Sequence, residues 1–128
     1  MAYTLTFDRK PEYLHVKVTG ENSPESVTGY LSEVHRACSG AECPGLLIEE
    51  DLRGPSIAVS DVFAIVSEGS RSMPPGIRKI AFVDLNSGHD FARMQFAETV
   101  AVNRGINMRL CRSLEEAEKW LLAEGAGP

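Results

Sequence analysis

The chain alternates short apolar runs with stretches of helical spacing from residue 45 onward, and this alternation limits the fold more than any other feature. The apolar runs lie at 45–48, 80–83 and 108–111, and their length and composition are typical of buried strands. Helices are predicted over 59–70, from 91 to just before Gly105, and from residue 114 onward. Strands joined through helices are normally parallel with right-handed crossovers, so this part of the chain predicts a parallel α/β sheet.

The first forty residues add a hairpin and one more helix. Residues 3–7 and 14–18 alternate apolar with polar side chains, and a polar link containing Pro11 joins them, which predicts two antiparallel strands. Ser23 and Pro24 then supply a helix cap and a first helical residue, and Gly40 is the expected stop. The predicted order is β-β-α-β-α-β-α-β-α: a single mixed, mostly parallel five-stranded sheet flanked by about four helices. We expect one domain over 1–128, with residues 124–128 as a frayed tail.

Composition excludes several classes of function. The 128 residues suit about one domain, and 18 acidic against 13 basic residues give a net charge of −5. That balance argues against a nucleic-acid-binding protein. No apolar run is long enough for a transmembrane segment, and the N-terminus lacks the features of a signal peptide. The three cysteines fit a reducing cytoplasm better than a disulfide framework, and no cofactor is expected.

Four segments carry a resemblance to a known family. They are Gly45-Leu46-Leu47-Ile48-Glu49, Val59-Ser60-Asp61-Val62-Phe63, the strand segment 77–83, and the closing helix 113–121 with Leu-Glu-Glu-Ala-Glu-Lys-Trp-Leu. Together they resemble the STAS-like family of bacterial proteins related to stage II sporulation protein AA. The resemblance covers nearly the whole chain and implies one mixed sheet flanked by helices. It also implies a module that binds a protein or a small ligand and has no established catalysis.

The start of the second helix departs from that family's regulatory branch. There, a phosphorylatable Ser lies within an Asp-Ser-Ser/Thr-Gly word, whereas this chain has Arg53-Gly54-Pro55-Ser56 and then Ser60. Ser56 and Ser60 therefore match the phosphosite by position only, and capping of the second helix is the expected role. Phosphorylation is the alternative, with Arg53 either pairing with the phosphate or lying in water.

Acidic residues follow the central strands. Glu49, Glu50 and Asp51 are expected to end the strand at 45–48, and Asp84 to end the strand at 80–83. Ligands of open parallel sheets bind beyond these carboxyl ends, so Asp51 and Asp84 are weak candidates for a metal site or a shared proton. Adjacent strand residues point to opposite faces, however, so Glu49 and Glu50 cannot face one site. We expect no metal.

His35, Cys38 and Cys43 have a spacing that a zinc site could use, but zinc needs a further ligand. Cys38 also fits the apolar stripe of the first helix, and a buried cysteine is usually a small core residue. Neither a zinc site nor a thiol nucleophile is expected.

Two helices carry apolar stripes with specific consequences. In the last helix, Ser113 begins a capping box, and residues 114, 117 and 121 are predicted to face the sheet. In the third helix, one stripe comprises Phe91, Met94, Ala97 and Ala101, and Phe96 and Val100 widen it beyond what one buried face needs. The surplus must be covered by a neighbouring helix, a ligand or a second copy, and we expect a homodimer with this helix at its interface.

Three functions remain after this reasoning. The first is a non-catalytic regulatory or binding module of STAS-like type that contacts a protein partner or a second copy. The alternative is a carrier of a small apolar or lipid-like ligand, held between the second and third helices under Phe63, Phe91 and Met94. The third is a small metal-assisted hydrolase that uses the acidic strand ends.

Overall fold

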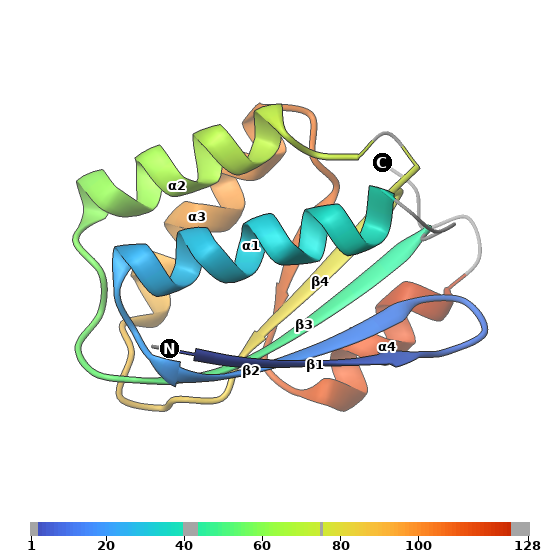
Figure 1. Cartoon of the computed structure of the whole chain (residues 1–128), viewed down its shortest axis with the longest axis horizontal. Coiled ribbons are helices and arrows are strands. Elements are labelled where there is room, and N and C mark those ends of the chain that lie inside the picture. Colours follow the sequence, from blue (N-terminus) through green and yellow to red (C-terminus); the bar gives the residue numbers. More distant parts are fainter. Residues whose placement is uncertain (1–2, 40–43, 75, 124–128) are drawn as a thin grey trace.

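The computed structural model describes residues 3–39, 44–74 and 76–123, and within them one five-stranded sheet forms the centre of the molecule (Figure 1). Its strands follow chain order: β1 (Tyr3–Arg9), β2 (Leu14–Glu21), β3 (Gly45–Arg53), β4 (Lys79–Asp84) and β5 (Met108–Cys111). β1 pairs with β2 antiparallel, and the remaining neighbours are parallel. The predicted mixed, mostly parallel α/β sheet is confirmed.

Four helices connect and cover the strands: α1 (Pro24–Ser39), α2 (Val59–Arg71), α3 (Phe91–Asn103) and α4 (Leu114–Leu122). The caps expected at α1 and α4 are present, because Ser23 Oγ accepts from the backbone N–H of Ser26 and Ser113 Oγ accepts from that of Glu116, both at 3.1 Å. α3 is capped by Asp90, whose side chain accepts from the Ala92 N–H. The predicted stop at Gly40 and the tail at 124–128 lie outside the described residues.

β3 is longer than the sequence indicates, and this corrects one prediction. The acidic residues 49–51 do not end the strand, which continues to Arg53. The physical reason is its neighbour: β2 stays paired with β3 up to Glu21 opposite Arg53, so the backbone groups of the acidic segment have ladder partners. Asp84 ends β4 as predicted.

The two faces of the sheet are covered by different helices (Figure 1). α1, α2 and α3 cover one face, over the larger core, and α4 covers the other, over a smaller core. Side chains of β3 and β4 alternate between these cores. Even-numbered residues such as Ile48 and Phe82 face the three helices, and odd-numbered residues such as Leu47 and Val83 face α4.

The stripe predicted for α4 is only partly correct. Ala117 is fully buried and Leu121 packs against the smaller core, but Leu114 is 37% exposed. Leu114 is the first residue of α4, and it lies one turn before Ala117, where the helix meets the sheet.

Within the described part of the chain, no helix is long and apolar enough to cross a membrane.

Candidate functional site

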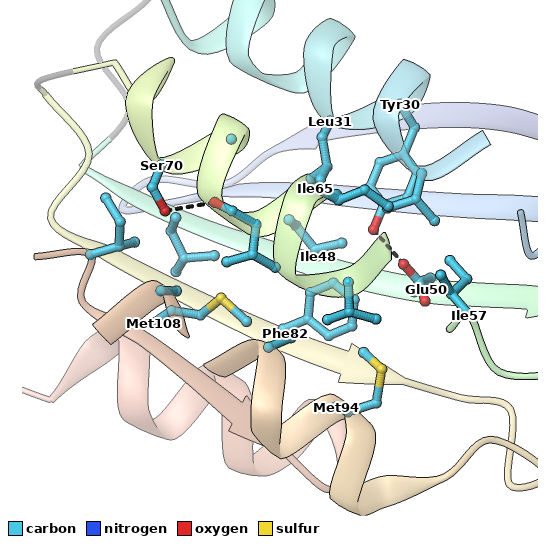
Figure 2. Close-up of a pocket in the computed structure, with 18 of the residues that line it drawn as sticks. Tyr30, Leu31, Ile48, Glu50, Ile57, Ile65, Ser70, Phe82, Met94 and Met108 are labelled. Atoms are coloured by element: carbon cyan, nitrogen blue, oxygen red, sulfur yellow. Dashed lines mark hydrogen bonds between the residues drawn. The ribbon is translucent and has the colours of Figure 1, made fainter. Parts of the chain in front are cut away.

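A pocket lies between the sheet and the three helices on its larger-core side (Figure 2). Its volume is about 120 Å³. The floor comes from β3 and β4 through Ile48 and Phe82, and the walls include Leu31 of α1, Ile65 of α2 and Met94 of α3. Its lining is therefore mostly aliphatic, aromatic and methionine side chains, as is typical of sites for small organic ligands.

Small residues on the helices leave this space. Ala97 and Ala101 of α3 and Gly69 of α2 line the pocket. A Cβ added at Gly69 would meet only the His35 Cε1 atom, at 3.8 Å, among the described residues. Helices with larger side chains at these positions would fill the gap between themselves and the sheet. The pocket is thus a consequence of three short side chains on facing helices.

One side of the pocket carries the buried carboxyl group of Glu50, which is 4% exposed. Strand alternation places it there, because Glu50 follows Leu46 and Ile48 on the face of β3 that α1 covers. The Tyr30 hydroxyl of α1 donates a hydrogen bond to Glu50 Oε2 (Figure 2). Burial raises the pKa of Glu50 to about 7; the charge of Asp84 adds to the rise, and Tyr30 and His89 oppose it.

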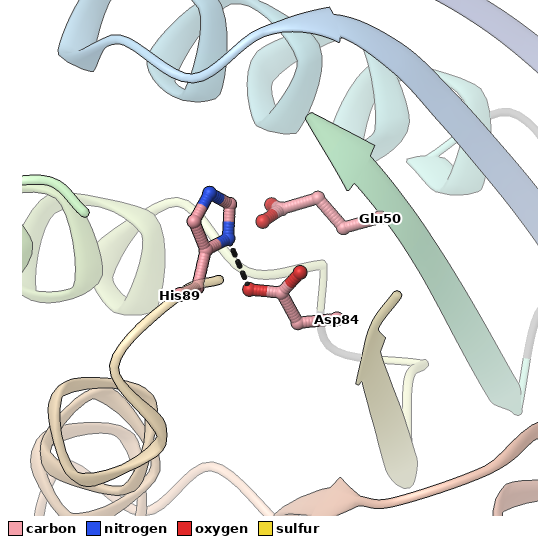
Figure 3. Close-up of side chains that lie close together, drawn as sticks. All are labelled: Glu50, Asp84 and His89. Atoms are coloured by element: carbon pink, nitrogen blue, oxygen red, sulfur yellow. Dashed lines mark hydrogen bonds and ion pairs between the residues drawn. The ribbon is translucent and has the colours of Figure 1, made fainter. Parts of the chain in front are cut away.

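Asp84 and His89 stand beside Glu50 (Figure 3). Strand register brings Asp84 next to Glu50, because the two residues are paired across β3 and β4 and share a face. His89, in the loop before α3, places Nδ1 2.7 Å from Asp84 Oδ2 and Nε2 3.0 Å from the Gly54 carbonyl oxygen. One ligand atom from each of Glu50, Asp84 and His89 lies within 4.8 Å of the others.

Each member of this cluster already has a hydrogen-bond partner in the protein. Asp84 accepts from the Asn86 backbone N–H through Oδ1 and faces His89 through Oδ2. No buried side-chain nitrogen or oxygen in residues 3–39, 44–74 and 76–123 lacks a partner. A metal ion here would have to replace the bond between Asp84 and His89, so the geometry describes a hydrogen-bonded polar cluster at the edge of an apolar pocket.

The structure separates Asp51 from Asp84, the two acidic residues considered from the sequence as a weak metal site. Asp84 lies in the cluster, but Asp51 is exposed and belongs to the odd-numbered series of β3. The weak metal candidate formed by Asp51 and Asp84 is therefore not brought together. Glu49 and Glu50 do face opposite sides as expected, since Glu49 pairs with His15 at 2.8 Å while Glu50 meets Tyr30.

The three residues predicted to cover the pocket, Phe63, Phe91 and Met94, are corrected in part. Met94 lines it, whereas Phe63 and Phe91 are not among the described lining residues. Phe63 is 47% exposed, with the Arg104 guanidinium 5.3 Å from its ring centroid. Phe91 packs at the margin of the larger core beneath the Arg112 guanidinium. The pocket lies between three helices and the sheet rather than between α2 and α3 alone.

Neither Ser56 nor Ser60 caps α2, so the predicted capping role is wrong. The N-cap residue is Ala58, and no side chain bonds the free N–H groups there. Ser56 Oγ instead accepts from the Asp90 backbone N–H at 2.9 Å, which links the loop before α2 to the cap of α3. Ser60 is exposed in the first turn of α2, and Arg53 is exposed at the end of β3.

The remaining sequence candidates are dispersed. Cys38 is buried in the larger core, Cys111 lies in the smaller core across the sheet, and Cys43 is outside the described residues. His35 lines the pocket, and burial lowers its pKa. In α3, Val100 is buried and Phe96 is half-buried, so much of the surplus stripe is covered within one copy of the chain.

Sequence reasoning missed His89 and gave Glu50 no role. The signal for Glu50 was available in the alternation of β3, where the apolar residues at 46 and 48 place residue 50 on the larger-core face. The approach of His89 had no local signal, because a loop brings its ring back onto the strand ends.

A scan against protein-family models and a search of curated protein sequences each found no match. Solved structures do match. An anti-sigma factor antagonist from Mycobacterium paratuberculosis superposes with a TM-score of 0.60 at 13% identity, covering 94% of this chain and 95% of that one. A DUF3478-family protein with a SpoIIAA-like fold from Shewanella loihica PV-4 gives a TM-score of 0.56 at 14% identity, covering 94% of each chain. These likenesses, together with the order of strands and helices, show that the chain has the STAS-like fold of SpoIIAA-related proteins.

Proposed function

We propose that this chain is a non-catalytic binding module that holds a small apolar ligand in the pocket between α1, α2, α3 and the sheet. The observation that carries the proposal is the pocket itself, about 120 Å³ in volume and lined mainly by apolar side chains. Its volume is comparable to that of an engineered apolar cavity of about 150 Å³ that binds benzene. The pocket suits a single ring or a short alkyl chain, which is narrower than the small apolar or lipid-like ligand considered as the alternative from the sequence.

The arrangement supports binding rather than chemistry. The polar cluster of Glu50, Asp84 and His89 is engaged in hydrogen bonds to Tyr30, to the backbone and within itself. A nucleophile and base poised toward an open reacting position are the usual mark of covalent catalysis, and these three side chains are not arranged in that way. The metal-assisted hydrolase considered from the sequence therefore gains no support from their contacts.

Toluene is a direct probe of the pocket. We expect millimolar toluene to shift the side-chain NMR signals of Ile65, Met94 and Met108, which line the pocket. Ala97→Leu should abolish these shifts, because Ala97 lines the pocket and the larger side chain would occupy it. Ala92→Leu is the matched control on an exposed position of the same helix and should leave them intact. Absence of any toluene-induced shift in the wild type would contradict the proposal.

A second candidate function is contact with a protein partner, and the exposed face of α2 favours it. Val59 and Phe63 are four residues apart, so they share one face of the helix, and they are 48% and 47% exposed. The fold is also that of a protein described as an anti-sigma factor antagonist, whose name implies protein partners. The partner here would be another protein or a second copy of this chain.

We place the module in the cytoplasm, where its odd number of cysteines suits a reducing environment.

A further inference from the structure

Most polar groups that line the pocket are already committed to protein partners. Ser70 Oγ donates to the Val66 carbonyl oxygen at 2.8 Å, and Ser56 Oγ accepts from the Asp90 N–H. The Arg93 guanidinium donates to the Ile57 carbonyl oxygen at 2.9 Å. Both ring nitrogens of His89 lie at hydrogen-bond distance from the protein. The remaining capacity for new hydrogen bonds must therefore be sought elsewhere in the lining.

Glu50 is a buried lining residue with acceptor capacity to spare. Among the described residues, the Tyr30 hydroxyl alone donates to its carboxyl group. An ionised carboxylate has about four acceptor positions, so one donor leaves most of them unused. A buried carboxylate with few donors is costly, and a further donor beside it would be stabilising. Figure 2 shows this group at one side of the pocket, with Ser70 and Met108 at the opposite side.

Charge beside Glu50 limits what that donor can be. Asp84 is its neighbour across the strands, so two carboxyl groups stand together at this side of the pocket. An anionic ligand group would add negative charge beside these two carboxyl groups in a buried place, which is unfavourable. A neutral or cationic donor would instead complement the site.

We propose that the ligand of this pocket has an apolar body and one hydrogen-bond-donating head, an alcohol or an amine, which binds the Glu50 carboxyl group. This inference rests on the proposed function, since it identifies the chemical class of the ligand that the pocket takes. The apolar body lies toward Met108 and the head lies beside Tyr30 and Glu50.

Four probes of similar size separate this inference from the proposed function. Toluene has no head, benzyl alcohol has a neutral donor, benzylamine has a cationic donor, and benzoate has an anion. In NMR titrations at pH 7.5, benzyl alcohol and benzylamine should bind roughly tenfold more tightly than toluene, the effect of one hydrogen bond to a buried carboxylate. Benzoate should bind more weakly than toluene, because of the charges of Glu50 and Asp84.

Substitution of Glu50 tests whether its carboxyl group binds the head of the ligand. Glu50→Gln should leave toluene affinity unchanged and remove the advantage of benzylamine, because the amide carries no charge. Glu49→Gln is the matched control: Glu49 is the adjacent buried carboxyl group on the opposite face of β3, so the order of the four probes should be unchanged. Retention of the full benzylamine advantage in a folded Glu50→Gln protein would overturn the inference.

The wild type supplies a second measurement that does not depend on the folding of a variant. Nuclear Overhauser effects from the methylene group of bound benzylamine should reach Tyr30 and Glu50, and those from its ring should reach Met108. A methylene group near Ser70 or His35 instead would contradict the assigned orientation. Between pH 6 and pH 8 the affinity for benzylamine should rise as Glu50 ionises, and that for benzyl alcohol should rise less, because a protonated carboxyl group can still accept a hydrogen bond from an alcohol.

The outcomes bear on the two proposals separately. If none of the probes binds, both the proposed function and this inference fail. If toluene binds as tightly as benzyl alcohol and benzylamine, the apolar pocket stands and the donor head is wrong. If benzoate binds most tightly, the head group contacts a cation such as Arg93, and the assignment to Glu50 is overturned.

Discussion

At the scale of single residues, Glu50 is a carboxyl group buried against an apolar pocket. A carboxyl group that is 4% exposed loses most of its hydration, and burial is accordingly the largest cause of its pKa of about 7. Its adjacent residue Glu49 is also buried but pairs with His15 on the α4 side. Two neighbouring acids therefore have different surroundings, solely because strand residues alternate between faces.

The raised pKa of Glu50 predicts a pH dependence of stability. The folded protein holds the Glu50 proton more tightly than the unfolded chain, where the pKa is near 4.5, so the free energy of unfolding should fall as pH rises from about 4.5 to 7. The difference amounts to roughly 3 kcal/mol at about 1.4 kcal/mol per pKa unit. Urea unfolding of the wild type and Glu50→Gln across this range measures it.

Glu50→Gln should lack this component of the pH dependence, while Glu49→Gln should keep it. The comparison between variants matters because His35 acts in the opposite direction. Its pKa is lowered by burial, so the stability that depends on neutral His35 is lost as pH falls below about 6.5. Parallel pH profiles for the wild type and Glu50→Gln would show that the pKa of Glu50 is the same in the folded and unfolded protein, which would contradict the raised value.

At the scale of elements, α4 is a structural cover for the second face of the sheet. Its apolar contacts come from Ala117, Trp120 and Leu121, which pack against residues of β3, β4 and β5. Lys79 at the start of β4 donates to the Trp120 and Ala123 carbonyl oxygens, which satisfies acceptors at the end of the helix. The pocket lies on the opposite face, so α4 supports the sheet without contacting the candidate site.

Two leucines of α4 give a matched test of this packing. Leu121→Ala should lower the free energy of unfolding by about 1–2 kcal/mol, less than a fully buried leucine would, because Leu121 is half-buried. Leu114→Ala should change it by less than about 0.5 kcal/mol, since Leu114 is exposed. Equal losses in urea unfolding would mean that the exposed first turn also docks on the sheet.

At the scale of the whole molecule, the surface expected to mediate self-association changes from α3 to α2. The homodimer predicted from the sequence relied on uncovered apolar surface along α3, but Val100 of that surface is buried within one copy. The exposed apolar pair Val59 and Phe63 on α2 is an alternative surface for contact between two copies. A homodimer remains a prediction, now with α2 at its interface.

Sedimentation velocity at tens of micromolar tests that dimer. The wild type should sediment at twice the mass of the chain, and Phe63→Glu should convert it to the monomer, because the interface would bury an unpaired carboxylate. Phe96→Glu on α3 is the comparison and should leave the dimer intact. A monomeric wild type would contradict the homodimer, and a dimer lost only in Phe96→Glu would return the interface to α3.

Local signals explain how much of the fold could be predicted. Period-2 alternation, short apolar runs and helical spacing located every strand and helix in the described residues, and Ser23 and Ser113 cap the helices they were expected to cap. Predictions failed where a contact with another part of the chain determined the local structure. β3 runs past its acidic residues because β2 pairs with it, and Ser56 bonds to Asp90 rather than to α2.

The sequence by itself determined the order of strands and helices and the opposite faces of Glu49 and Glu50, because periodicity is a local property of the chain. Tertiary structure decided the pocket and its polar side. Ala97 and Gly69 leave space only because their helices face each other across the sheet, and His89 reaches Asp84 only because the loop before α3 folds back onto the ends of β3 and β4. Contacts between residues distant in sequence depend on how whole elements pack, and no local spacing encodes that packing.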